Sequence, residues 1–193
     1  MKKIIVSFLF AVLLLPAFSQ DDQKGFKREN MFIGSGVNLS FFNGFILGLN
    51  PEIGYSLNRF VDAGVATNFS YITQNYINSP ETDRFLILGG GPYVRIWPAQ
   101  MLFLGGQFEY NYISFSTKNG GQVYNKGNTS APSVLVGGGY GSRFPGQSQF
   151  YVSIMVDVLR NPRSPYVDQF NRMQPVFRTA FLFYLRPKNQ AGR

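Results

Sequence analysis

The chain has 193 residues, of which 45% are hydrophobic and 17% aromatic, with a formal net charge of +8 and a mean hydropathy of −0.06. Cysteine and histidine are both absent. Their absence excludes a disulfide scaffold, a lipid-modified cysteine anchor, thiolate or imidazole metal sites, and enzymes that depend on a histidine base. We therefore expect no cofactor, no metal and no enzymatic activity.

The first nineteen residues have the pattern of a secretory signal peptide. Lys2 and Lys3 precede an apolar run over residues 4–15, and Pro16 then leads to small residues ending at Ser19. We predict cleavage after Ser19. The alternative, an N-terminal membrane anchor, needs a longer apolar run than this one. Residues 20–30 are then expected to form a short N-terminal periplasmic segment.

The rest of the chain alternates between apolar or aromatic residues and small or polar ones in eight segments. A period of two is the signature of β-strands, because successive side chains point to opposite faces. None of these segments approaches the run of about 20 apolar residues that a transmembrane helix needs. The predicted strands are Met31–Phe41, Phe45–Leu57, Val61–Tyr71, Arg84–Trp97, Leu102–Phe115, Ser133–Arg143, Gln149–Leu159 and Gln174–Leu185.

The small-residue face of these strands carries full charges, which an oily barrel interior would not tolerate. Together with the export signal, this favours an all-β, eight-stranded antiparallel up-and-down transmembrane β-barrel over residues 31–185, with a polar, side-chain-filled interior and a C-terminal tail over 186–193. We predict its location as the outer membrane of a Gram-negative bacterium, with the longer loops 72–83, 117–132 and 161–173 outside. A soluble lipocalin-like carrier is the alternative, and it requires the opposite sidedness.

An eight-stranded barrel has an interior only wide enough to be filled by side chains. Charges inside it are costly unless they pair, so we expect the inward carboxylates to pair with inward arginines and plug the lumen. The alternative is a gated proton or ion path, and the sequence leaves open which acid meets which arginine. The predicted inward ion-pair network is Glu52, Asp62, Arg95, Glu109, Arg143, Asp157 and Arg178.

Several segments resemble those of a known family. They are Leu49–Tyr55, Gly91–Arg95 and Tyr151–Leu159, and they are similar to the outer-membrane β-barrel domain family of Bacteroidetes-type bacteria, which is related to OmpA-type and OmpX-type barrels. Residues Arg178–Leu185 are similar to the C-terminal signal that the barrel-assembly machinery reads. The resemblance implies a barrel over essentially the whole mature chain and supplies no catalytic residues.

We therefore predict a structural or surface-interaction role. The expected partners are outer-membrane lipid and lipopolysaccharide, the barrel-assembly machinery, and an unidentified extracellular partner. Nucleic acid is not expected, because the excess positive charge is spread over termini and loops. A small passive pore for small solutes is the alternative function. Possible loop contact residues, which could equally pack the loops onto the barrel rim, are Tyr124, Arg163, Tyr166 and Phe170.

Overall fold

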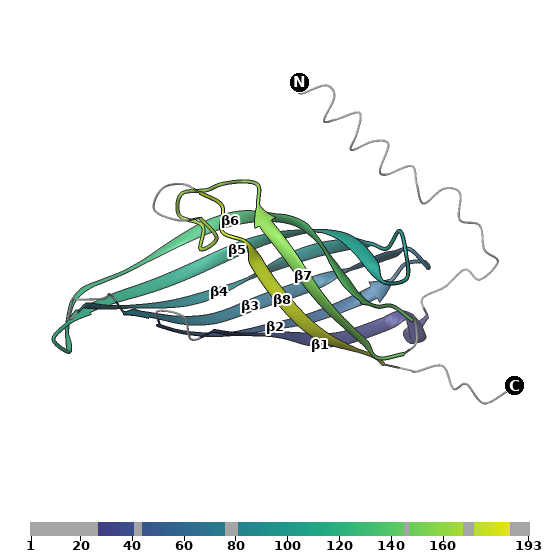
Figure 1. The fold of residues 1–193 in the computed structure, drawn as a ribbon, viewed down its shortest axis with the longest axis horizontal. Helices are drawn as coiled ribbons and strands as arrows, with labels where there is room; N and C mark the ends of the chain where they lie inside the picture. The colour runs from purple at the N-terminus through teal and green to yellow at the C-terminus, as the bar shows by residue number, and fades with distance from the viewer. Residues whose placement is uncertain (1–26, 41–43, 76–80, 145–146, 168–171, 186–193) are drawn as a thin grey trace, which may run out of the picture.

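The computed structural model describes residues 27–40, 44–75, 81–144, 147–167 and 172–185. After the short 3-10 helix η2 (Arg28–Asn30), these residues form eight antiparallel strands that close into a barrel in the order of the chain (Figure 1). The strands are β1 (Met31–Ser40), β2 (Gly44–Ser56), β3 (Val61–Asn75), β4 (Glu81–Ile96), β5 (Leu102–Asn119), β6 (Gln122–Ser142), β7 (Gln149–Asp157) and β8 (Val176–Tyr184).

The barrel closes where the first strand pairs with the last. β1 and β8 are in register from Phe32 opposite Tyr184 to Gly36 opposite Ala180. Closure matters because it leaves no unpaired sheet edge at that level of the barrel. The predicted eight-stranded antiparallel barrel is thus confirmed.

Alternation along each strand sorts apolar side chains outward and polar ones inward. On β5, for example, Leu104 is 63% exposed whereas Glu109 is fully buried. On β8 the burial alternates residue by residue, with Phe177 and Phe181 outside and Arg178 inside. The predicted polar, side-chain-filled interior is therefore confirmed as well.

Inward glycines make room for large neighbours in this narrow interior. The Phe32 ring is fully buried against β2 at Gly54, where an added Cβ would lie 2.6 Å from the ring atom Cε2. A larger residue at Gly54 would therefore displace this ring and the Tyr184 ring that packs edge-on against it.

The prediction of a long loop over residues 117–132 is wrong. β5 and β6 instead continue to a two-residue turn at Gly120 and Gly121, which have φ values of 56° and 87°. Two left-handed residues are what a tight hairpin turn requires, and glycine adopts that conformation without strain. The loop predicted over 72–83 is also too long, because β3 runs to Asn75 and β4 begins at Glu81.

The longer strands create a sheet that rises beyond the closed part of the barrel. β6 is in register with β7 from Leu135 to Ser142, and Val134 also accepts a hydrogen bond from the backbone amide of Val158. In the described part of the chain, residues 122–133 of β6 pair with β5 alone. Figure 1 shows β5 and β6 reaching well past β7 and β8 at one end. We call residues 69–75, 81–88, 112–119 and 122–130 the protruding sheet.

The predicted signal peptide, the segment 20–26, Phe170 and the tail 186–193 lie outside the described residues.

Candidate functional site: the polar network of the lumen

Charged side chains from different strands meet inside the barrel at three levels. Each inward arginine pairs with an acid that lies far away in sequence, so each pair ties distant strands together across the lumen. Burial of both partners strengthens their attraction and makes an unpaired charge costly. In the described part of the chain the pairs are Arg95 with Glu52, Arg143 with Asp62 at 2.7 Å, and Arg178 with Glu109 at 2.6 Å.

The first level lies at the end of the barrel with the short turns. The Asp62 carboxylate accepts hydrogen bonds from Arg143 Nη2 at 2.7 Å, from Trp97 Nε1 at 2.7 Å and from Ser56 Oγ at 2.7 Å. Arg143 also donates to the backbone carbonyl of Asn58, at 2.8 Å, in the turn between β2 and β3. This arginine therefore joins the end of β6 to the opposite side of the barrel.

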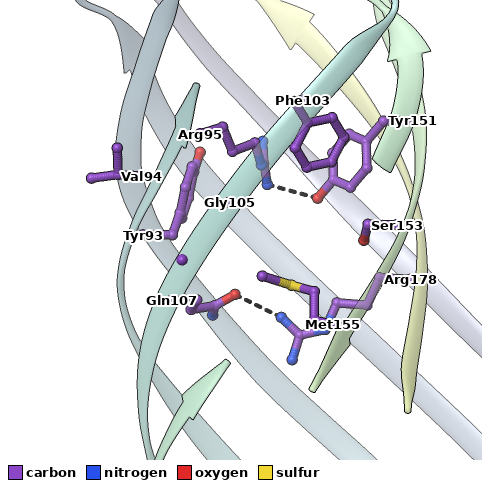
Figure 2. Close-up of a pocket in the computed structure, with 11 residues that line it drawn as sticks. Tyr93, Val94, Arg95, Phe103, Gly105, Gln107, Tyr151, Ser153, Met155 and Arg178 are labelled. Carbon is purple, nitrogen blue, oxygen red and sulfur yellow. Dashed lines mark hydrogen bonds between the residues drawn. The ribbon is translucent and has the colours of Figure 1, made fainter. Parts of the chain in front are cut away.

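The middle level combines an ion pair with aromatic rings. Arg95 Nη2 donates to the Tyr151 hydroxyl at 2.7 Å (Figure 2). The same nitrogen pairs with Glu52, and the Tyr151 hydroxyl donates in turn to Glu52 Oε1 at 3.0 Å. The Arg95 guanidinium carbon lies 4.3 Å from the ring centroids of both Tyr93 and Tyr151. Cation–π contacts of this kind add to the charge pairing when the cation is desolvated.

The third level lies under the segment that follows β7. Arg178 donates to Glu109 and, at 2.7 Å, to Gln107 Oε1. The Tyr166 hydroxyl donates to the other Glu109 oxygen at 2.6 Å and accepts from Asn68 Nδ2 at 2.8 Å. Burial, followed by the nearby Glu109 carboxylate, raises the pKa of Tyr166, so the hydroxyl keeps the proton that it donates. Through these bonds Tyr166 holds the segment after β7 against the polar side chains of the lumen.

Asp157 does not pair with an arginine, which corrects the expectation that every inward acid would do so. Its carboxylate accepts from Ser164 Oγ at 2.6 Å and from the backbone amides of Val134 and Leu159 at 3.0 and 3.1 Å. These donors satisfy the buried charge locally. Asp157 therefore holds the turn after β7 against β6. Its charge lies at the end of the lumen next to that turn.

A cavity of about 20 Å³ lies between Arg95 of the middle level and Arg178 of the third level (Figure 2). It is lined by Arg95 and Arg178, each of which keeps one buried guanidinium nitrogen, Nη1 and Nε respectively, without a protein hydrogen-bond partner. This volume is enough for about one water molecule, which needs polar partners of this kind. It is far too small for a sugar, a nucleotide or a lipid chain.

The predicted loop contact residues divide into two kinds. Tyr124 is 61% exposed beside the tip of the β5–β6 hairpin and donates to Glu81 Oε1 at 3.1 Å, and Arg163 is exposed in the segment after β7. Tyr166, in contrast, directs its hydroxyl into the lumen, so it is a packing residue and not an exposed contact.

The acids of this network are held by arginines, hydroxyls and amides rather than placed as metal ligands. Among the described residues, no group of three or more acidic side chains could hold a metal ion. Within the same ranges, no helix has the length and apolar character needed to cross a bilayer.

Neutral partners of the charges were not predicted as hydrogen-bonding groups. Tyr151 and Trp97 were not predicted as members of the network, although each donates a hydrogen bond to one of its carboxylates. An inward Tyr or Trp in the sequence could have indicated such a hydrogen bond. When these residues are buried, the hydroxyl or the indole N–H generally finds a hydrogen-bond partner.

No known protein family and no curated protein matches this sequence. Two solved structures of Ail, the attachment invasion locus protein of Yersinia pestis, are similar in fold. The structure of Ail in complex with the heparin analogue sucrose octasulfate is 13% identical, with a TM-score of 0.42, covering 79% of this chain and 92% of that one. A second structure of Ail is 15% identical, with a TM-score of 0.37, covering 79% and 91%. These values are too low to support an inference, so the fold assignment rests on the strand pairing described above.

Replacing Glu109 by leucine should leave Arg178 buried without its countercharge. We expect the free energy of unfolding to fall by about 3–5 kcal/mol, measured by urea titration of the refolded protein with Trp97 fluorescence as the signal. The double variant Glu109→Leu/Arg178→Met should recover much of that loss, because neither charge is then left alone. Equal losses in the single and double variants would show that the pair does not act as a unit.

Replacing Tyr166 by phenylalanine should loosen the segment after β7 without opening the barrel. A hydrogen bond to a charged group contributes about 1.5–3 kcal/mol, and this one is lost. We expect faster tryptic cleavage at Arg160, Arg163 and Arg172, followed by mass spectrometry. Tyr124→Phe is the matched control, because its hydroxyl bonds at the exposed hairpin tip. Identical cleavage rates in the two variants would contradict the role given to Tyr166.

Proposed function

We propose that this protein is an integral outer-membrane β-barrel of a Gram-negative bacterium, with a structural or surface-interaction role. The observation that supports it best is the sidedness of the closed barrel. Phe177 and Phe181 are 65% and 55% exposed outside, whereas Asp62 and Glu109 are fully buried inside. An apolar surface of this extent is unfavourable in water and suits a hydrocarbon environment. A closed ring also satisfies the backbone groups that lipid cannot.

The height of the apolar surface fits a bilayer. Along β5 the outward apolar residues begin at Leu102 and end at Tyr112. Ten steps of about 3.4 Å, tilted by about 40°, rise roughly 26 Å, close to the apolar band of known outer-membrane barrels. The strand continues beyond Tyr112 with Ser114 and Ser116 outward, where a bilayer would end.

The C-terminal strand has features suited to barrel assembly. Phe181, Phe183 and Leu185 are 55%, 56% and 47% exposed on the outer face, spaced two residues apart. We propose that Arg178–Leu185 is the segment read by the assembly machinery, and that export depends on a signal peptide cleaved after Ser19. Both features suit a protein delivered unfolded to the outer membrane.

The protruding sheet is the surface we propose for interaction with an extracellular partner. Among the described residues, β6 pairs over residues 122–133 with β5 and with no second strand. An unpaired strand edge can add a strand from a partner protein. Val123 and Tyr124, 51% and 61% exposed next to the hairpin tip, provide apolar contact area beside that edge.

A passive pore is the alternative function. It requires an open lumen, and the interior instead holds three paired arginines and a cavity with room for about one water molecule. We propose that transport does not take place in this arrangement.

The test is insertion followed by conductance. The refolded protein should enter phosphatidylcholine vesicles, resist carbonate extraction and migrate differently on a denaturing gel before and after boiling. In a planar bilayer it should give no conductance steps above background. Release by carbonate would favour a soluble carrier, and regular conductance steps would favour the pore.

A further inference from the structure

Three basic side chains lie on the outward face of the protruding sheet. Arg84 on β4 is opposite Ser116 on β5, and Ser116 is opposite Lys126 on β6, so the two basic residues flank a serine in one row. Lys118 is two residues further along β5 and faces the same way. Arg84 and Lys126 are exposed and Lys118 is half-buried.

The two faces of this sheet carry opposite charges. Asp83 and Glu81 alternate with Arg84 along β4, so they belong to the inner face. The Glu81 carboxylate accepts a hydrogen bond from the Tyr124 hydroxyl. Charge separation of this kind leaves a positive potential on the outer face, close to the part of the barrel that meets lipid.

Strand register shows where this basic row lies relative to the apolar surface. A row is a set of outward-facing residues that lie opposite one another on neighbouring strands. Towards the β5–β6 hairpin tip, each row is two residues, or about 6.8 Å, beyond the one before. At a strand tilt of about 40° this corresponds to about 5 Å of height. The rows change from mainly apolar to mixed to basic. They are Phe69–Leu88–Tyr112–Ser130, then Tyr71–Leu86–Ser114–Asn128, then Thr73–Arg84–Ser116–Lys126.

The basic row is therefore about 10 Å above the last mainly apolar row, near the depth of lipid headgroups. Long arginine and lysine side chains reach several ångströms along a surface while their stems stay on apolar neighbours. Leu86, 44% exposed, lies directly below Arg84 on the same face of β4. A lipid whose acyl chains lie on Leu88 and Tyr112 would have its headgroup beside Arg84 and Lys126.

We propose that Arg84, Lys118 and Lys126 bind the phosphate of an outer-leaflet lipid headgroup, with Ser116 between them as a neutral donor. This inference rests on the proposed function and names the partner of that same membrane surface. Membrane lipid is favoured over a soluble phosphate because the site continues the apolar surface on the same strands.

The test compares two triple variants with equal charge loss. Arg84→Gln/Lys118→Gln/Lys126→Gln removes the site, and Arg28→Gln/Arg59→Gln/Arg160→Gln removes three exposed charges elsewhere. Each protein is placed in phosphatidylcholine nanodiscs containing lipid A with or without its phosphates, and retained lipid A is counted by native mass spectrometry. We expect phosphorylated lipid A to be retained by the wild type and the control, with retention falling about fivefold per charge removed at the site.

Two results overturn the inference while the barrel remains inserted. One is equal retention by the two triple variants, and the other is equal retention of lipid A with and without phosphate. Failure of the wild type to insert at all would overturn the proposed function, and this inference with it. Heat-modifiable migration of every variant shows that each has folded.

Discussion

The narrow lumen of a closed eight-stranded ring is the constraint on which this structure depends. Any charge that points inward is shut away from water and must find a partner within the width of the barrel. Arg95, Arg143 and Arg178 do so by pairing with acids on other strands. The paired charges thereby become part of the core, beside a buried aromatic cluster that includes Phe32, Trp97 and Phe103, and most other apolar side chains face the surroundings.

The way in which each end of the lumen is closed follows from the same constraint. At the short-turn end, Arg143 reaches across the lumen to a turn carbonyl, which closes that end with side chains. At the other end β7 and β8 are only nine residues long, so the lumen would be open there. Residues 158–167, which follow β7, lie at that opening, held by Tyr166 on Glu109 and by Ser164 on Asp157. β3, β4, β5 and β6 continue past this segment and form the protruding sheet.

Alternation in the sequence was sufficient to predict the barrel and the inward direction of residues such as Glu52 and Arg95, because a strand buried on one face repeats every two residues. It could not predict that Arg178 meets Glu109, because that depends on which strands oppose each other across the ring. It also failed for residues 117–132, because beyond the apolar surface both faces of these strands are mostly polar and the period of two disappears. Gly120-Gly121 was the remaining signal of a hairpin there. Tyr166 was predicted either to contact a partner or to pack its loop onto the rim, and its hydrogen bond to Glu109 was not predictable, because a loop has no period that shows where a side chain points.

The most direct measurement of the sidedness is quenching of tryptophan by brominated acyl chains. The chain has a single tryptophan, Trp97, which is 2% exposed and bonded to Asp62 inside the barrel. In vesicles of brominated phosphatidylcholine the wild-type fluorescence should be nearly unchanged, whereas Phe108→Trp should add emission that the bromine atoms quench strongly. Strong quenching of Trp97 together with an unquenched residue at position 108 would contradict the account.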